Sequence, residues 1–160
     1  MAQLLIVEDD CITALALQHA VTRMGHAVVA RASSAAEAMA AVQAYRPDVV
    51  LLDIRLRGAQ DGVRVGTAIQ ALWSIPVIYL SGLDPSQLGI PDFPEALWCY
   101  LAKPIAWDQL QDILARLCPM HPSRPRMPGS GLEDARPPIR LPTQALREQL
   151  RQWRQPVGAL

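Results

Sequence analysis

Four apolar runs in the chain each end in a polar side chain, and side chains of these kinds could together carry out phosphoryl chemistry. The runs end in Glu8-Asp9-Asp10, in Asp53, in Ser81 and in Lys103. A carboxylate that attacks phosphorus needs a fixed position, a metal ion to neutralise the incoming phosphoryl group, and donors for the remaining oxygens. A serine hydroxyl and a lysine ammonium are suitable donors. Lys103 is the only lysine beside fourteen arginines, so a specific role is expected for its ammonium.

Three of the carboxylates indicate a metal site. If the first and third strands are neighbours, their ends lie about 5 Å apart, so Glu8, Asp9 and Asp53 share one crevice. Carboxylates that close repel one another unless a cation lies between them. A hard divalent ion removes this repulsion, and magnesium suits one or two carboxylates plus a phosphate better than calcium does. Asp10 is instead the candidate N-cap of the following helix, which leaves Glu8 and Asp9 for the ion.

Ordinary structural roles are the alternative for the hydroxyl and the cation. Ser81 with Gly82 could form only a turn, and Lys103 could be a surface charge. Either role is common for an isolated residue. Four polar endings of complementary chemistry nevertheless favour one shared site.

Segments with helical periodicity separate the apolar runs and must position these side chains. Helices are expected at residues 10–24, from Ser34 to before Pro47, at 62–73 and at 106–117, with a short strand at 26–30. Gly25 can close the first helix in the left-handed conformation, and Ser34 with Glu37 forms a capping box. Strand then helix, repeated about five times, predicts parallel strands with helices on both faces of the sheet. In such sheets ligands bind at the carboxyl ends of the strands, where the four polar endings lie.

Composition divides the chain near Cys118. Residues 1–118 contain twelve acids and eight bases, a net charge of −4, whereas residues 119–160 contain three acids and seven arginines, a net charge of +4. Eight of the fourteen prolines also fall after residue 118. Such a segment cannot bury a core of its own, so we expect one domain at 1–118, a Pro/Gly/Arg-rich linker at 119–141 and a C-terminal tail at 142–160.

The tail contains a candidate amphipathic helix at residues 143–154. Leu146, Leu150 and Trp153 lie at helical spacing, and three arginines lie on an adjacent stripe. A helix of this length is marginal alone in water, so it could dock on the acidic domain, bind a partner or fray. Nucleic acid is not an expected partner, because no recognition fold fits in so few residues.

Five short stretches resemble the receiver domain of bacterial two-component response regulators. They are LLIVEDD at 4–10, VLLDIRL at 50–56, DG at 61–62, IYLSG at 78–82 and YLAKP at 100–104. The resemblance covers about residues 3 to 118. It implies a flavodoxin-like, doubly wound α/β fold with a five-stranded parallel sheet in the order 2-1-3-4-5 and helices on both faces.

The resemblance also implies roles for the acidic residues. Asp53 would accept a phosphoryl group from a sensor histidine kinase, a phosphotransfer protein or a small acyl phosphate. Asp9 and Asp53 would bind Mg²⁺ directly, Glu8 would bind it through water, and Arg55 through its backbone carbonyl. Catalysis would be limited to this self-catalysed phosphotransfer and to autodephosphorylation, so the chain would not be a conventional enzyme.

Further roles are implied for the remaining endings. Ser81 and Lys103 would hold phosphoryl oxygens. Tyr100 matches an aromatic switch position, whose ring turns inward as the hydroxyl of Ser81 moves toward the phosphate. The bond between Lys103 and Pro104 is expected to be cis.

One segment departs from the family pattern. Where receivers usually place their fourth helix, Pro85, Gly89, Pro91 and Pro94 interrupt any regular pattern. We expect a short turn at 84–89 and irregular chain to about residue 96. This weakens the expectation of a homodimer formed through that face, as in many relatives, but a homodimer stays an option beside an unknown downstream protein target.

Other functional classes fit the sequence less well. A degenerate receiver that binds partners without phosphorylation would not need the intact acids, Ser81 and Lys103. A magnesium phosphohydrolase of another α/β family would need a second aspartate two residues after a nucleophile on the first strand, which Glu8-Asp9-Asp10 does not supply. The three cysteines show no paired metal-ligand spacing and are read as packing residues. Without a long apolar run or a signal peptide, the protein is expected in the cytoplasm and not in a membrane.

Overall fold

Five short apolar segments form one parallel β-sheet in the computed structural model, which describes residues 1–56, 62–82 and 97–118. The strands are β1 (Gln3–Val7), β2 (Ala27–Ala32), β3 (Val49–Asp53), β4 (Val77–Ser81) and β5 (Trp98–Ala102). Their spatial order is β2-β1-β3-β4-β5, and all four neighbouring pairs are parallel. The predicted order 2-1-3-4-5 is therefore confirmed. The polar residues at or directly after the carboxyl ends of β1, β3, β4 and β5 consequently lie at the same end of the strands.

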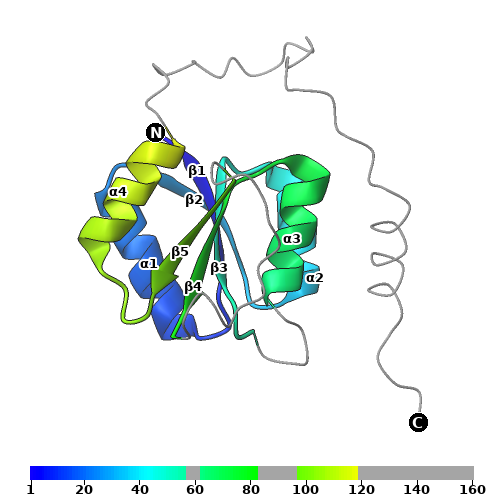
Figure 1. The fold of residues 1–160 in the computed structure, drawn as a ribbon, viewed down its shortest axis with the longest axis horizontal. Coiled ribbons are helices and arrows are strands. Elements are labelled where there is room, and N and C mark those ends of the chain that lie inside the picture. Colours follow the sequence, from blue (N-terminus) through cyan, green and yellow to red (C-terminus); the bar gives the residue numbers. More distant parts are fainter. Residues whose placement is uncertain (57–61, 83–96, 119–160) are drawn as a thin grey trace.

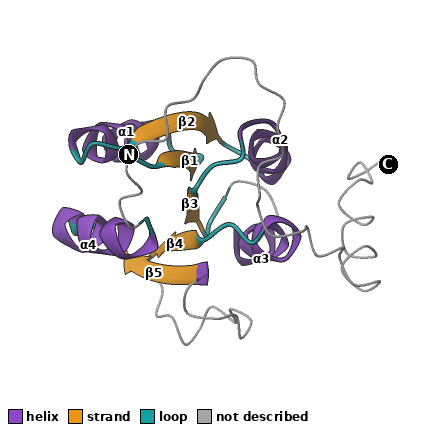
Figure 2. Cartoon of the chain, turned by 90° about the horizontal axis from the view of Figure 1, so that it is seen from above, coloured by secondary structure: helices purple, strands orange, loops and turns teal. Residues whose placement is uncertain are grey.

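Four helices in the described residues cover the two faces of the sheet. They are α1 (Cys11–Arg23), α2 (Ala35–Tyr45), α3 (Gly62–Trp73) and α4 (Trp107–Leu117). Figure 2 shows α1 and α4 on one face and α2 and α3 on the other. Because side chains alternate along a strand, Leu4 and Ile6 of β1 pack toward α1 and α4, whereas Leu5 and Val7 pack toward α2 and α3. Burial on both faces explains why the strands are almost continuously apolar.

The first helix begins and ends where the sequence predicts. Asp10 is its N-cap, and its Oδ2 accepts hydrogen bonds from the Thr13 backbone N–H at 2.9 Å and from the Thr13 hydroxyl at 2.6 Å. Gly25 follows the helix with a φ of 84°, a conformation that costs glycine little. The prediction of Asp10 as a cap is confirmed. Its carboxylate is thereby directed toward α1.

Two local predictions need correction. The strand expected at 26–30 is β2 at Ala27–Ala32, because its pairing with β1 continues to Val7. Ser34 caps α2 by accepting from the Glu37 N–H at 3.3 Å, as predicted. The Glu37 carboxylate, however, accepts from the N–H and hydroxyl of Ser33 and not from the N–H of Ser34. The reciprocal half of the capping box is therefore displaced by one residue.

A buried polar network joins α3 to β4 and to the residue before β5. The Gln70 side chain, 2% exposed, donates from Nε2 to the carbonyl of Leu97 at 2.7 Å. Its Oε1 accepts from the hydroxyl of the fully buried Tyr79 at 3.3 Å. Gly66 makes room for this phenol, since a Cβ at residue 66 would lie 2.3 Å from the Tyr79 Oη. The network satisfies the polar groups that burial takes out of water.

Replacing Gly66 with alanine is therefore expected to destabilise the protein. Gly→Ala in a helix interior normally stabilises by roughly 0.5–1 kcal/mol, but overpacking a core costs about 1–3 kcal/mol. Urea unfolding should show a net loss of stability. In a Tyr79→Val background, where the ring is absent, the same Gly66→Ala change should become stabilising. A gain in stability in the wild-type background would contradict the close packing of these two residues.

Several predicted segments lie outside the described residues. These are the turn at 84–89 with the irregular chain to about residue 96, the linker at 119–141 and the tail at 142–160. Within the described ranges, no helix has the length and apolar character needed to span a bilayer.

Candidate functional site

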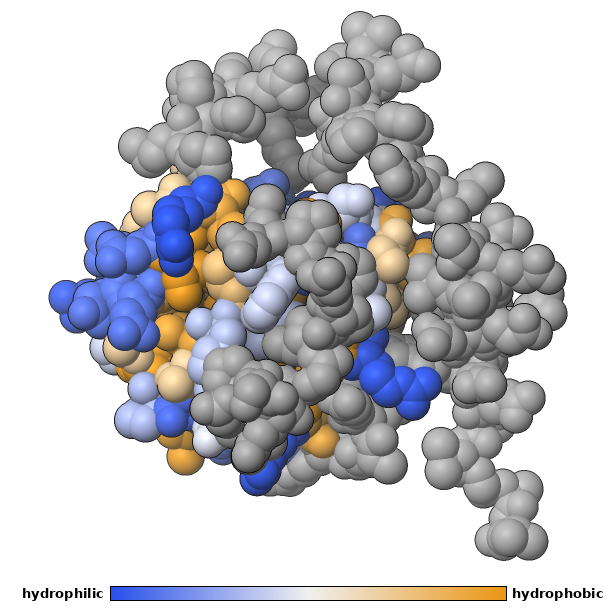
Figure 3. Space-filling view, in the orientation of Figure 1, coloured by the Kyte–Doolittle hydropathy of each residue, from blue (hydrophilic) through white to orange (hydrophobic). Residues whose placement is uncertain are grey.

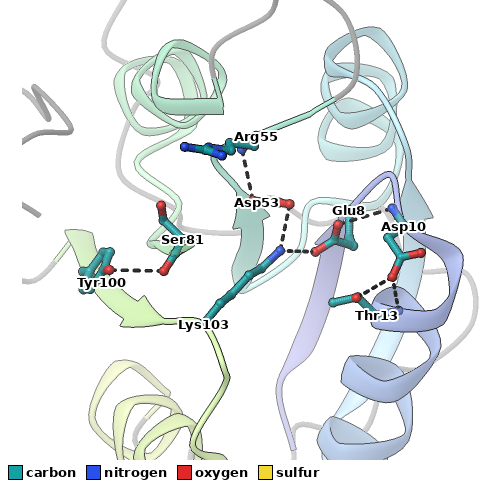
Figure 4. A network of polar contacts seen from close by, with 8 residues as sticks. All are labelled: Glu8, Asp10, Thr13, Asp53, Arg55, Ser81, Tyr100 and Lys103. Atoms are coloured by element: carbon teal, nitrogen blue, oxygen red, sulfur yellow. Dashed lines mark hydrogen bonds and ion pairs between the residues drawn. The ribbon is translucent and has the colours of Figure 1, made fainter. Parts of the chain in front are cut away.

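Side chains from four strand ends converge at the carboxyl edge of the sheet (Figure 4). Glu8 follows β1, Asp53 ends β3, Ser81 ends β4 and Lys103 follows β5. In the pairing of β1 with β3, Val7 lies opposite Leu52, which brings the next residues, Glu8 and Asp53, side by side. The sheet order therefore assembles the site from segments far apart in the sequence.

Three carboxylates lie together at this edge. One oxygen each from Glu8, Asp9 and Asp53 lies within 4.8 Å of the other two. Glu8 is 4% exposed and Asp53 6% exposed, while Asp9 is half-buried. Oxygen ligands alone, at this spacing and partly shielded from water, fit a hard divalent cation such as Mg²⁺.

Lys103 links two of the carboxylates. Its Nζ lies 2.8 Å from Glu8 Oε2 and 2.8 Å from Asp53 Oδ2, and Figure 4 shows the ammonium between them. Burial alone would lower the pKa of Lys103, but the hydrogen bonds to Asp53 and Glu8 outweigh it, so its pKa is raised. The ammonium is therefore charged at neutral pH. Water still screens these two ion pairs in part, because 29% of the Lys103 side chain is exposed.

Glu8 is held in an environment that disfavours its charge. Burial raises the pKa of the Glu8 carboxyl, its hydrogen bond to Lys103 opposes this, and the negative charge of Asp53 adds to the rise. The net pKa lies above the ordinary value of 4.5. A cation bound beside Glu8 would favour the ionised form, so binding of a metal and binding of a proton compete here.

Backbone groups fix the position of Asp53. The Arg55 N–H donates to Asp53 Oδ1 at 3.0 Å, so each carboxylate oxygen of Asp53 has a donor. Gly62 begins α3 directly against this strand end, because its N–H donates to the Ile54 carbonyl at 2.9 Å. A Cβ at residue 62 would lie 2.3 Å from the carbonyl oxygen of Asp53. Only glycine lets α3 begin so close to Asp53, a constraint that sequence reasoning did not identify.

One peptide carbonyl ties β4 to β5 beside the site. The carbonyl of Ser81 accepts from the backbone N–H of Lys103 at 2.8 Å and from the hydroxyl of Tyr100 at 3.1 Å. Ser81 is 2% exposed, and Tyr100 is half-buried. Because Asp53 pairs with Leu80, Ser81 lies one residue farther along β4, toward its carboxyl end. The Lys103–Pro104 bond is cis, as predicted.

The structure thus brings most of the predicted site residues together. Glu8, Asp9, Asp53 and Lys103 form one cluster, and Ser81 and Tyr100 adjoin it on β4 and β5. Arg55 lies at the start of the loop after β3, where its N–H already contacts Asp53. The roles of these residues in binding Mg²⁺ and a phosphoryl group stay predictions.

Known proteins match the same part of the chain. The family profile described as "Response regulator receiver domain" matches residues 4–115. The transcriptional regulatory protein AfsQ1 of Streptomyces coelicolor is 31% identical over 105 residues, which are 66% of this chain and 46% of AfsQ1. The match therefore spans less than half of that relative.

Solved structures agree with the sequence comparison. The receiver domain of Erythrobacter litoralis PhyR is 25% identical with a TM-score of 0.66, covering 77% of this chain and 94% of that domain. PhyR from Bartonella quintana, described as an anti-anti-sigma factor, is 26% identical with a TM-score of 0.63. That match covers 72% of this chain and 46% of the Bartonella protein.

Proposed function

Because the chain belongs to the response regulator receiver family, we propose that it accepts a phosphoryl group on Asp53 in a magnesium-dependent reaction and then signals through protein contacts. The observation that carries this proposal is the pairing of Lys103 with both Glu8 and Asp53 beside a third carboxylate. Three carboxylates and one ammonium leave an excess of negative charge. A divalent cation would balance that excess and complete a site for phosphoryl transfer.

Asp53 is the proposed nucleophile. One of its carboxylate oxygens attacks the phosphorus of a phosphohistidine or of a small acyl phosphate. The bond between phosphorus and the donor's nitrogen or oxygen breaks, and its electron pair stays on the donor. The hydrogen bond from the Arg55 N–H and the ion pair with Lys103 hold the carboxylate in place for this attack.

Neighbouring residues would bind the metal ion and the oxygens of the transferred group. Asp9 and Asp53 would bind Mg²⁺ directly, Glu8 through water and Arg55 through its carbonyl. When bound, the ion supplies positive charge that offsets repulsion between the carboxylates and the phosphoryl oxygens. Lys103 exchanges its bond to Asp53 for one to a phosphoryl oxygen.

Residues of β4 and β5 would change conformation after phosphorylation. The Ser81 hydroxyl donates to another phosphoryl oxygen, and Tyr100 would respond to the movement of Ser81. The hydrogen bond from the Tyr100 hydroxyl to the Ser81 carbonyl supports this coupling.

The proposed partners are proteins on both sides of this step. A sensor histidine kinase or a phosphotransfer protein supplies the phosphoryl group, and a downstream protein reads the altered receiver. We assign the receiver to residues 1–118, a linker to 119–141 and a tail to 142–160. The family is not one of conventional enzymes, so catalysis here is limited to the domain's own phosphorylation and dephosphorylation.

A second candidate is a receiver that binds its partner without phosphorylation. It is favoured by the likeness to PhyR proteins, of which the Bartonella example is described as an anti-anti-sigma factor. In that case the acidic cluster and Lys103 would act mainly as structural ion pairs. The two candidates differ in one measurable property, the uptake of a phosphoryl group.

Incubation of the full chain with acetyl phosphate distinguishes them. With Mg²⁺ present, intact-mass spectrometry should detect the addition of one phosphoryl group. With the metal removed by a chelator, the addition should disappear. A chain that stays unmodified at saturating acetyl phosphate and Mg²⁺ would favour the phosphorylation-independent candidate.

A further inference from the structure

Apolar side chains are exposed at the start of two helices that adjoin the site. Ile12 and Leu15 of α1 are 74% and 55% exposed, and Trp107, the first residue of α4, is 43% exposed. They are three of the five large apolar residues that are exposed in the described ranges. Figure 3 shows apolar surface among hydrophilic surface on the side where Figure 1 places α1 and α4.

These residues lie at the same edge of the sheet as the acidic cluster. Both helices pack on one face, since Ala14 and Leu17 of α1 and Leu110 and Leu114 of α4 belong to one hydrophobic cluster. The helix α1 starts directly after the carboxyl end of β1, and α4 starts shortly after that of β5. A segment lying over the first turns of α1 would therefore lie at the same end of the strands as the acidic cluster.

The charges on this face are acidic near the site and basic away from it. Asp10 precedes α1, and Asp108 and Asp112 are exposed on the first turns of α4. The basic residues of the two helices, Arg23 and Arg116, come in the last turns. No acidic residue lies within α1 itself, so the negative charge on this face comes from its cap and from the neighbouring α4, and it suits a partner that is apolar and positively charged.

We propose that the C-terminal segment 143–154 of this same chain docks on the outer face of α1. Its sequence supplies Leu146, Leu150 and Trp153 at helical spacing for Ile12 and Leu15. Arginines at residues 147, 151 and 154 lie beside that stripe at helical spacing and could pair with the acidic side chains. The net charges of +4 after residue 118 and −4 before it have the same complementarity. Burial against α1 would stabilise a helix that is marginal alone.

The connecting chain is long enough for this contact. The tail leaves the domain at the end of α4, which at 1.5 Å per residue lies about 16 Å from the start of that helix. Residues 119–142 include seven prolines, and a proline-rich segment of this length can extend to about 75 Å at roughly 3.1 Å per residue, so its length permits the tail to reach α1. A covalent connection to the domain gives the segment an effective concentration that we take to be on the order of 1 mM. A contact with a dissociation constant near 0.1 mM would then keep it docked about nine-tenths of the time.

This contact does not depend on the proposed function. It can be tested without any phosphodonor, so its failure and the failure of the proposed function are distinguishable.

Labelling of Cys11 with a maleimide measures the contact directly in the full chain. Cys11 is exposed at the first position of α1, next to Ile12. Burial raises the pKa of the Cys99 thiol and raises that of Cys118 to about 11, so both react slowly near neutral pH. Peptide mapping measures the labelling of Cys11 separately from that of Cys99 and Cys118. The variant Leu150→Glu places a charge on the apolar stripe of the tail, and Gln152→Glu is the matched control away from it.

Cys11 should be labelled about tenfold more slowly in the wild type and in Gln152→Glu than in Leu150→Glu, and dilution should not change this ratio. Amide hydrogen exchange of α1 should show the same difference without a labelling reagent. Equal labelling and exchange in the wild type and in Leu150→Glu would overturn the proposal. Protection that disappears on dilution would also overturn it, because the occupant would then be a second copy of the chain.

Discussion

Replacing Asp53 with asparagine is expected to abolish phosphoryl acceptance from acetyl phosphate. The amide has nearly the same shape, and its oxygen can still accept from the Arg55 N–H, but it lacks a nucleophilic carboxylate. The fold should persist, because the change also removes one of three mutually repelling charges. Intact-mass spectrometry of the variant with Mg²⁺ and acetyl phosphate makes the measurement, and circular dichroism checks the fold.

Asp10→Asn is the matched control for this experiment. Asp10 lies at the same edge and carries the same charge, but its oxygen caps α1 by accepting from Thr13. Asparagine caps a helix about as well as aspartate, so labelling should continue in this variant. A phosphoryl group that is still found on Asp53→Asn would show that another residue is the acceptor.

Replacing Lys103 with methionine is expected to destabilise the metal-free protein strongly. The change leaves Glu8 and Asp53 buried without the ammonium that bonds to both. Removing one partner of a buried ion pair costs roughly 3–5 kcal/mol, and the partial exposure of Lys103 reduces this to about 2–3 kcal/mol. Urea unfolding at neutral pH in the presence of a chelator measures the loss. Millimolar Mg²⁺ should restore part of the stability, since an ion that binds only the folded state stabilises it.

The pH dependence of this loss follows from the direction of the Glu8 pKa. The folded-state pKa of Glu8 is raised above 4.5, and loss of the ammonium raises it further. A carboxyl with a raised pKa favours folding below its unfolded pKa, and this contribution is lost as the pH rises through the folded value. The deficit of Lys103→Met should therefore be large at neutral pH and small below about pH 4.5.

Arg116→Met provides a control for the change in net charge. Arg116 is exposed near the end of α4, where its removal should change stability by less than about 0.5 kcal/mol. An equal loss of stability in Lys103→Met and Arg116→Met would show that the ion pairs at the site contribute little.

Much of the fold could be predicted because local and long-range signals agree. Asp10 and Gly25 mark the ends of α1, and both have the expected conformation. The apolar runs before Asp53 and Ser81 are buried strands, as their composition indicates. The convergence of Glu8, Asp53 and Lys103 followed once strand ends were identified, because parallel strands present their carboxyl ends at one edge.

Other features depend on distances that no single segment encodes. Gln70 resembles an ordinary polar position on a helix until Leu97 and Tyr79 are placed around it. Gly62 and Gly66 are needed because of backbone and ring atoms from β3 and β4. A glycine in the interior of a helical pattern was the available signal for Gly66. The sequence could indicate that another group packs closely against residue 66, but not that this group is the ring of Tyr79.

The carbonyl of Ser81, which accepts two hydrogen bonds, has a mechanical consequence for the ends of β4 and β5. This carbonyl belongs to the last peptide of β4, and it accepts hydrogen bonds from the Tyr100 hydroxyl of β5 and from the Lys103 backbone N–H. A rotation of that peptide would change both bonds at once, since the two donors share one oxygen. A movement of this strand end would therefore affect the tyrosine ring and the backbone that carries the lysine together.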